Sequence, residues 1–454
     1  MTEQSTSSSD RDSVPGRRDA FIDFCRALSL LVVVLWHWVF SIVYVGADDR
    51  VHVTNVLQFT YALWPLTWLF QVMPLFFFVG GFAHMQLWEK TRREGGSYGR
   101  FVIGRFSRLA LPALVVLGAW VIIGAVAIAA GGSRTFIVSA VVLIVSPLWF
   151  LAVYLLLVLW APVGLALHRR FGPVVVVALV GLAGLVDVAR FRGELGGLVV
   201  INMLFVWAAC HQLGFFYAKL VAGPRSWTWS LVLGGLLGLV VLIRTGLYPR
   251  SMVGVPGDPI SNMSPPTLAL LAHGIWLTGL VLVLRRPVTR WLRRPPAWAG
   301  VITANALAMT AFLWHLTALF AATAVVTALG LVQPAAGSLA WWLVRPVWIV
   351  VLASVTALFL LGFRRADRPR PATVGRFGSR WSSVAAATGV ALCSVGVLGF
   401  SLVGFGGVLA GRQALLLVAP ITPLWSTALL VVGAALLATS GVGTQVAPAR
   451  PYTR

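Results

Sequence analysis

Long apolar runs separated by short polar stretches make up almost the whole chain from residue 21 onward. Most runs hold about 20 residues, which is enough for an α-helix to cross the roughly 30 Å hydrocarbon core of a bilayer. About twelve spanning segments are predicted, near 21–45, 66–88, 109–130, 147–167, 172–189, 197–218, 227–247, 266–284, 303–327, 339–363, 383–409 and 414–440. The stretch 134–146 fits either a half-helix or the start of the fourth span. The pattern therefore predicts an all-α integral membrane protein.

Composition supports this prediction. Of the 454 residues, 59% are hydrophobic and 11% are charged, with a mean hydropathy of +0.89, whereas about a quarter of a soluble domain is charged. The net charge of +22 would suit a nucleic-acid partner, but the basic residues lie in short loops between apolar runs. We therefore expect contact with membrane lipids and no nucleic acid. The three cysteines all lie in apolar stretches, so neither a disulfide framework nor a metal site is predicted.

The basic residues alternate between the two sides of the predicted bundle. If the N-terminus is cytoplasmic, the inner segments hold 26 of the 35 Lys and Arg residues and the outer loops hold seven, while Arg26 and Arg345 fall within spans. Such an imbalance is what the positive-inside rule describes. We therefore expect a multi-pass protein of the cell membrane with both termini in the cytoplasm.

A basic stretch rich in Pro and Gly at 364–382 separates ten spans from a terminal pair that is nearly free of ionisable residues. We expect five segments: a disordered cytoplasmic tail at 1–19, a ten-span domain at 20–365, a basic linker at 366–382, a two-helix appendage at 383–440 and a second cytoplasmic tail at 441–454.

Three ionisable residues share one face of the first predicted span. Arg26 and His37 are eleven residues apart, which at about 100° per residue is three turns plus roughly 20°, with a rise near 16 Å. Asp23 lies one turn before Arg26. Buried charge in a membrane costs a few kcal/mol and normally faces the protein interior. The stripe predicts a functional polar path with His37 as general base. A snorkelling arginine and a structural histidine remain the alternative.

Other candidates are spread along the chain. His315, inside the ninth span, is the second catalytic candidate, because an intramembrane histidine needs a polar partner. Trp149 and Tyr154 in the fourth span, and Asn262 in a long outer loop, are candidates for substrate binding. Each of these four residues, taken alone, also fits a structural role.

Arg105 and Arg108 stand three residues apart, so they share a helix face close to an apolar run. A pair of guanidinium groups in that position suits phosphate recognition. An ordinary positive-inside loop is the alternative interpretation.

Four motifs, in order, resemble the acyltransferase 3 family of membrane-bound O-acyltransferases. They read IDFCRALSLLVVVLWH, MPLFFFVGGF, GRFVIGRFSRLALP and SPLWFLAVYLL, and the resemblance covers about residues 20–365. Two further stretches, NMSPPTLALLAHGIW and WWLVRPVW, look like an actinobacterial branch. One departure is that Gly80-Gly81-Phe82 replaces the family's usual Ser-Gly-Phe, so no hydroxyl is present there.

The resemblance implies a ten-span bundle, here with about two extra C-terminal helices. It implies transfer of an acyl group, commonly acetyl, from cytoplasmic acyl-CoA to a hydroxyl of an extracytoplasmic carbohydrate, glycolipid or natural product, with no permanently bound cofactor. Arg26 and His37 match the family's motif pair, and Arg105 and Arg108 its Arg-x-x-Arg element. We expect the arginine pair to bind CoA phosphates, Asp23 to orient Arg26, and Arg26 to polarise the donor or help bind it.

Two other functions remain open at this stage. Twelve spans and a buried Arg–His stripe would also fit a transporter or flippase of a lipid-linked glycan, although no inverted repeat relates the two halves. A non-catalytic sensor or assembly subunit is the third possibility.

Overall fold

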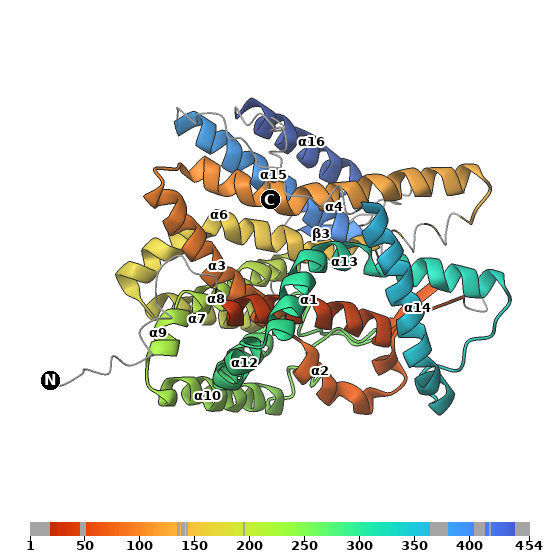
Figure 1. Cartoon of the computed structure of the whole chain (residues 1–454), viewed down its shortest axis with the longest axis horizontal. Helices are drawn as coiled ribbons and strands as arrows, with labels where there is room; N and C mark the ends of the chain where they lie inside the picture. Colours follow the sequence, from red (N-terminus) through yellow and green to blue (C-terminus); the bar gives the residue numbers. More distant parts are fainter. Residues whose placement is uncertain are drawn as a thin grey trace.

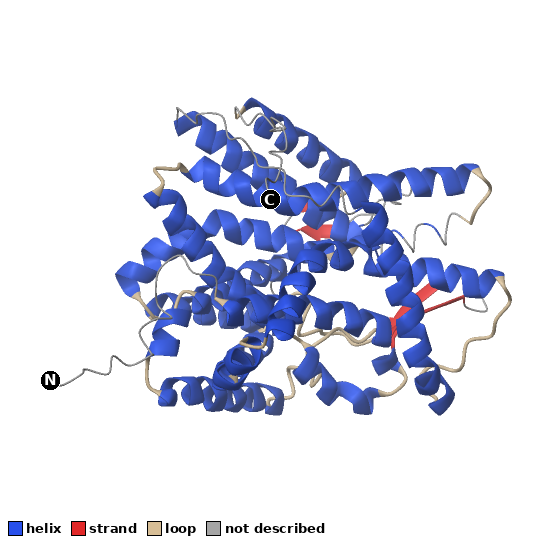
Figure 2. Cartoon of the chain, in the orientation of Figure 1, coloured by secondary structure: helices blue, strands red, loops and turns tan. Residues whose placement is uncertain are grey.

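The computed structural model describes residues 19–45, 51–133, 137, 141, 144–193, 196–363, 380–403, 414–416 and 419–440. Helices run through nearly all of this part of the chain, and the strands form two short ribbons (Figure 2). The two predicted tails, apart from residue 19, and most of the predicted linker lie outside the described residues.

The α-helices, in chain order, are α1 (Ala20–Phe40), α2 (Trp64–Phe70), α3 (Met73–Arg93), α4 (Tyr98–Ala129), α6 (Leu148–Phe171), α7 (Val174–Phe191), α8 (Asn202–Gly214), α9 (Tyr217–Ala222), α10 (Arg225–Arg244), α11 (Leu268–Val283), α12 (Arg285–Leu292), α13 (Pro295–Ala328), α14 (Leu339–Phe363), α15 (Arg380–Val403) and α16 (Pro423–Thr439). The short 3₁₀ turns are η2 (Val56–Gln58), η3 (Tyr61–Leu63) and η4 (Gly196–Ile201). The strands β1 (Ser41–Val45) and β2 (Val51–Asn55) pair antiparallel, as do β3 (Ala414–Leu416) and β4 (Ala419–Ile421).

Ten helical segments in the described part are long and apolar enough to cross a membrane. The pair α11 and α12, bent by 52° at their junction, gives an eleventh candidate, and α16 is a shorter apolar helix. These candidates account for eleven of the twelve predicted spans. The twelfth, predicted at 414–440, begins instead with the paired strands β3 and β4, and only the 17-residue helix α16 follows. The prediction of an all-α integral membrane protein is therefore confirmed.

The end of the first span differs from the prediction. A helix was expected over 21–45, but α1 ends at Phe40 and the next five residues form β1, paired with β2. This segment reads Ser-Ile-Val-Tyr-Val, and β-branched and aromatic side chains pack well on a pleated surface. The apolar pattern alone does not distinguish such a short strand from a continuing helix.

A hydrogen-bonded brace sets where α1 begins. The Asp19 side chain accepts bonds from the backbone N–H groups of the first turn, at 2.9 and 3.1 Å. Tyr217 on α9 donates its hydroxyl proton to the other Asp19 oxygen at 2.8 Å and accepts from Arg285 Nε of α12 at 3.1 Å. Burial raises the pKa of Tyr217, so the phenol keeps this proton. The brace joins the starts of three helices.

Two glycines let α3 approach α8 closely. A Cβ atom on Gly81 would overlap the backbone carbonyl of His211, and one on Gly214 would overlap the carbonyl of Phe78. A Cβ on Gly80 would lie 2.8 Å from the Tyr154 ring. The Gly-Gly pair of the second motif therefore allows α3 to pack against α8 and α6 at short range.

The terminal helices join the main bundle through α15. Helix α15 packs against α16 and also against α4 and α6, at the top of the view in Figure 1. Ser383 Oγ accepts a bond from the backbone N–H of Gly99 at 3.3 Å, and Ser401 Oγ donates to the Val145 carbonyl at 3.4 Å. Both contacts attach α15 to the ten-span region.

Candidate functional site

Helices α1 and α13 form a seam whose first polar contact involves three side chains. Arg26 Nη2 lies 2.9 Å from Asp23 Oδ1, and Arg26 Nε donates to Asn305 Oδ1 at 2.8 Å. Asn305 Nδ2 in turn donates to the Asp23 backbone carbonyl at 2.8 Å. Asp23 is only 9% exposed. The carboxylate and the amide therefore hold the guanidinium against α13.

The second polar contact of the seam is a pair of histidines, which we call the seam pair. The rings of His37 on α1 and His315 on α13 have centroids 4.9 Å apart and an interplanar angle of 61°. His37 is half-buried and His315 is 1% exposed. Trp38 Nε1 donates to the His315 carbonyl at 3.1 Å, which fixes the two helices at this level.

The partners of the Nδ1 atoms define the tautomers of the seam pair. His37 Nδ1 lies 2.7 Å from the Val33 carbonyl, and His315 Nδ1 bonds the Phe312 carbonyl. A carbonyl can only accept, so each Nδ1 carries a proton and each neutral ring keeps its lone pair on Nε2. His315 Nε2 is buried without a hydrogen-bond partner among the described residues. The arrangement presents basic nitrogens inside the bundle.

The two contacts match in register. Arg26 and His37 are eleven residues apart on α1, and their partners Asn305 and His315 are ten residues apart on α13. At 1.5 Å per residue the contacts are separated by roughly 15–16 Å along the seam. Both Arg26 and His37 thus face α13. The sequence analysis missed Asn305, although an asparagine ten residues before a histidine in an apolar run is a detectable signal.

A second histidine pair, which we call the inner pair, links α3 to α8. His84 Nδ1 lies 3.0 Å from His211 Nε2, and both residues are 0% exposed. The other nitrogens, His84 Nε2 and His211 Nδ1, are buried without a partner in the part of the chain that the structure describes. The sequence analysis missed this pair because its members are 127 residues apart.

Arg105 lies beside the inner pair. Its guanidinium is close enough to interact electrostatically with His84, and its Nε is buried without a hydrogen-bond partner among the described side chains. Arg108, the other member of the predicted phosphate-binding pair, is exposed. The structure therefore separates the two arginines by environment, with Arg105 reaching the interior and Arg108 the surface.

Trp149 and Tyr154 belong to a layer of aromatic rings between the two histidine pairs. The Tyr154 ring lies 4.8 Å from His84, and the Trp149 ring stacks near Trp207 at 5.8 Å. The layer continues from Tyr154 to Phe150, from Phe150 to Phe312 and from Phe312 to His315, with centroids 6.0, 5.5 and 5.6 Å apart. Rings of the fourth span thus connect the inner pair to the seam pair.

Asn262 is fully buried, and its side chain is occupied within the outer loop. Its Nδ2 donates to the carbonyls of Pro249 and Ser251 at 2.6 and 2.9 Å, and its Oδ1 accepts from Thr267 Oγ1 at 2.7 Å. These bonds tie the loop to the start of α11. The structure therefore gives Asn262 a bracing position and does not bring it into the seam.

Within the described residues, no three His, Cys, Asp or Glu side chains are placed so that they could hold a metal ion. The side chains that meet in the seam carry imidazole, guanidinium, carboxylate and amide groups. A neutral imidazole with its lone pair inside the bundle can accept a proton, and a guanidinium held by hydrogen bonds can bind an anion or a carbonyl oxygen.

The comparisons with known proteins bear on the whole ten-span region. The chain matches no curated protein and no solved structure. A family model described as an acyltransferase domain, that of the acyltransferase 3 family, matches residues 19–365, about three quarters of the chain and nearly the range expected from its motifs. Because this match spans the seam, the inner pair and the aromatic layer together, the chain belongs to the acyltransferase 3 family and is a membrane acyltransferase.

Proposed function

We propose that this enzyme transfers an acyl group, acetyl in the first instance, from cytoplasmic acyl-CoA to a hydroxyl of a carbohydrate, glycolipid or glycosylated natural product. The observation that carries the proposal is the seam pair, in which two rings 4.9 Å apart keep their Nε2 lone pairs available. Such a nitrogen is suited to deprotonate a hydroxyl, because its lone pair is not engaged by a backbone group.

His37 is the general base of the proposed reaction. Its Nε2 takes the proton of the acceptor hydroxyl while the oxygen forms a bond to the thioester carbonyl carbon. The C–S bond then breaks, and the CoA thiolate leaves with the bonding electrons and takes the proton back from His37. Half-burial of His37 supports this assignment, since a substrate must reach its ring.

His315 assists by receiving a hydrogen bond from the protonated His37. The 4.9 Å centroid separation and the Nε2 lone pair of His315 support this role, since a protonated imidazole becomes a donor at both nitrogens. His315 also lies against the aromatic layer, which provides an apolar surface for the acyl group.

Arg26 acts on the donor at a distance from the reacting carbonyl. It lies roughly 16 Å along α1 from His37, so it is too far away to polarise the thioester carbonyl at which His37 acts. Its bonds to Asp23 and Asn305 hold it against α13 on the side of the chain's N-terminus. We therefore assign Arg26 to the pantetheine or phosphate part of acyl-CoA.

Arg105 and Arg108 supply positive charge for the donor phosphates at the same end of the bundle. The excess of Lys and Arg in the loops at this end supports its assignment to the cytoplasm, with both termini on that side of the cell membrane. The buried, unpartnered Nε of Arg105 supports its selection as the stronger contact of the two.

The test begins with the acceptor, which is identified by comparing glycolipid and polysaccharide masses between wild-type and deletion strains and searching for a lost acyl mass. Purified protein in proteoliposomes is then given acetyl-CoA and that acceptor, and free thiol release is measured. We expect acceptor-dependent CoA release that His37→Ala abolishes. His273→Gln is the control, because His273 is a fully buried histidine on α11 that lies outside the seam and bonds the Trp68 carbonyl. A His37→Ala protein that inserts normally and keeps full transfer would reject the proposal.

A further inference from the structure

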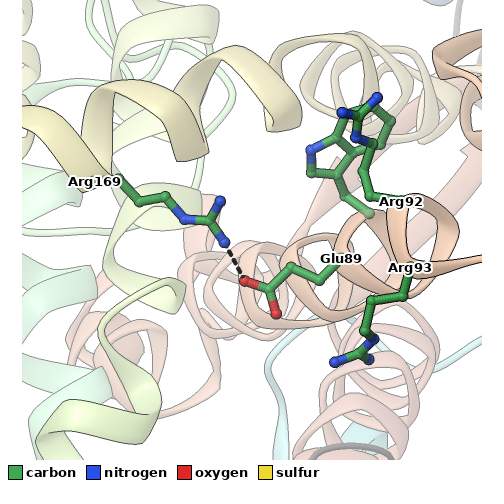
Figure 3. A pocket seen from close by; sticks show the side chains of 5 residues that line it. Glu89, Arg92, Arg93 and Arg169 are labelled. Carbon is green, nitrogen blue, oxygen red and sulfur yellow. Dashed lines mark hydrogen bonds and ion pairs between the residues drawn. The ribbon is translucent and has the colours of Figure 1, made fainter. Parts of the chain in front are cut away.

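A hollow of about 330 Å³ opens where α3 and α6 end. Its wall consists of Trp88, Glu89, Arg92, Arg93 and Arg169. Four of these residues come from the last two turns of α3, and Arg169 comes from the last turn of α6. In Figure 3, Arg169 reaches across from α6 toward Glu89, while Arg92 and Arg93 leave α3 on either side of Glu89.

An ion pair joins the two walls of this hollow. Arg169 Nη2 lies 2.6 Å from Glu89 Oε1. A guanidinium has five N–H donors, so this bond leaves Arg169 with donors for a second acceptor. Glu89 thereby holds Arg169 at the edge of the hollow, where a loose surface arginine would otherwise sample many rotamers.

Trp88 forms a fixed aromatic wall. Its ring packs edge-on against Phe101 at 5.4 Å and Tyr98 at 6.2 Å, both on the first turns of α4. The Arg92 guanidinium lies over the Trp88 ring at 5.7 Å. An indole with a guanidinium beside it offers a planar base a stacking surface and offers a phosphate a charged donor within the same small space.

The charge of the wall is positive overall. It carries three guanidinium groups and one carboxylate, and that carboxylate is already engaged by Arg169. The nearby Glu94 lies instead toward Lys90 and Arg100, at 3.8 and 3.6 Å. Arg92 and Arg93 are exposed, so both can turn toward an anion in the hollow. Arginine forks match phosphate oxygens in geometry as well as charge.

We infer that this hollow binds the nucleotide part of the acyl donor, with the adenine ring against Trp88 and the phosphate groups on Arg92, Arg93 and Arg169. The inference rests on the proposed function, in which acyl-CoA is the donor. A nucleotide that carries a planar base and several phosphates matches the aromatic and arginine wall better than a lipid headgroup, which has no base to stack.

The position of the hollow fits the rest of the site. Trp88 is four residues from His84 on α3, and Phe101 is four residues from Arg105 on α4, so the hollow lies one turn beyond the inner pair and Arg105. A nucleotide held there would direct its pantetheine arm past Arg105 toward the aromatic layer. Arg105 then meets the phosphate nearest the arm, and the hollow meets the nucleotide.

The experiment uses the full chain in lipid nanodiscs, with CoA and adenosine 3′,5′-bisphosphate as probes in equilibrium binding assays. The variant Arg92→Ala/Arg93→Ala removes two charges from the wall. The matched control Lys90→Ala/Arg100→Ala removes two charges from the adjacent ends of α3 and α4, outside the wall. We expect the bisphosphate to compete with CoA on the wild type. The wall variant should lower the affinity for both probes about tenfold or more, and the control should change either affinity less than about twofold.

A third variant, Trp88→Phe, keeps an aromatic ring and should retain most of the binding. Trp88→Leu should weaken binding of the bisphosphate more than it weakens binding of inorganic phosphate. If both double variants bind CoA as well as the wild type does, and the bisphosphate does not compete with CoA, the inference is overturned and the proposed function still stands. Wild type that neither binds CoA nor transfers from it would overturn both.

A lipid headgroup is the competing occupant. Nanodiscs of phosphatidylcholine and nanodiscs containing phosphatidylglycerol separate the two, since only the second supplies an anionic headgroup. Binding of the bisphosphate in phosphatidylcholine discs supports the nucleotide. The inference would be overturned if the bisphosphate bound in neither kind of nanodisc and if the wall variant alone lost its association with phosphatidylglycerol.

Discussion

The seam pair and the inner pair are both made of two histidines from different helices, yet they offer different chemistry. In the seam pair each Nδ1 bonds a backbone carbonyl of its own helix, so both Nε2 lone pairs are left for other partners. In the inner pair one ring donates a hydrogen bond to the other at 3.0 Å, so one nitrogen of each histidine is engaged by the other ring. The partner of a ring nitrogen therefore decides whether a buried histidine is placed to act as a base.

The two histidine pairs also differ in how deeply they are buried. His37 is half-buried, whereas both members of the inner pair are completely enclosed. The inner pair sits where Gly81 and Gly214 bring α3 and α8 into contact, and Arg105 lies beside it. We interpret the seam pair as the reaction centre and the inner pair as a helix-joining contact close to the donor's path.

The largest expected effect separates the two pairs directly. His37→Ala should lower kcat by about 10²- to 10⁴-fold, the range that general base catalysis contributes. His84→Gln, which keeps a hydrogen-bonding group in the inner pair, should lower kcat less than tenfold. Acceptor-dependent CoA release from proteoliposomes measures both, and equal losses in the two variants would contradict the comparison.

The next effect concerns coupling within the seam pair. If His315 acts only through the protonated His37, then His315→Ala should slow transfer strongly in the wild type but add little to His37→Ala. A double-mutant cycle on kcat measures this. Fully additive losses would mean that the two rings act independently.

Variants of the inner pair should change the free energy of unfolding. His211→Leu leaves His84 Nδ1 buried without its partner and should destabilise the fold by about 1–3 kcal/mol. Changing both residues to leucine removes both polar groups and should recover part of that loss. Thermal unfolding in detergent, followed by tryptophan fluorescence, measures the two proteins, and a double variant less stable than His211→Leu would contradict the prediction.

A smaller effect is expected at the first contact of the seam. Asn305→Ala removes the acceptor that holds Arg26 Nε, so Arg26 should lose its fixed position. Because Arg26 lies roughly 16 Å from His37, the change should raise KM for acetyl-CoA several-fold with little change in kcat. Initial-rate kinetics over a range of acetyl-CoA concentrations would reveal the split. A fall in kcat alone would place Arg26 at the reacting carbonyl instead.

The last comparison separates Arg105, which lies beside the inner pair, from the exposed Arg108. Arg105 has a buried Nε without a partner in the described region, and Arg108 is exposed. Arg105→Ala should weaken CoA binding about tenfold, and Arg108→Ala less than about threefold, because an exposed charge is screened by water and salt. Equilibrium binding at two salt concentrations compares them, and a larger loss in Arg108→Ala would reverse the assignment.

Much of the fold was predictable from residue patterns, because a bilayer allows few choices. An apolar run must form a helix that satisfies its own backbone, so hydropathy predicts that spans exist near 20–40 and 148–171. It does not predict that the first helix ends at Phe40. The hairpin of β1 and β2 was not predictable, since a short β-branched segment after a helix fits both structures.

Part of the seam was also predictable. The stripe of Asp23, Arg26 and His37 follows from helical periodicity, and His315 was selected because it is an ionisable residue within a span. That Arg26 meets Asn305 while His37 meets His315 depends on how α1 crosses α13, and periodicity on one helix carries no information about the crossing.

The amino-acid sequence by itself determined that this chain lies in a membrane, that one face of its first span is polar and that it carries the motifs of its family, because these properties are local in the chain. Only the tertiary structure decided that His84 and His211 share a hydrogen bond, that Asn262 is occupied within its loop and that Arg169 closes a hollow with Glu89. Contacts between distant segments depend on the angles and distances at which helices pack. Those are set by side-chain shape over the whole bundle.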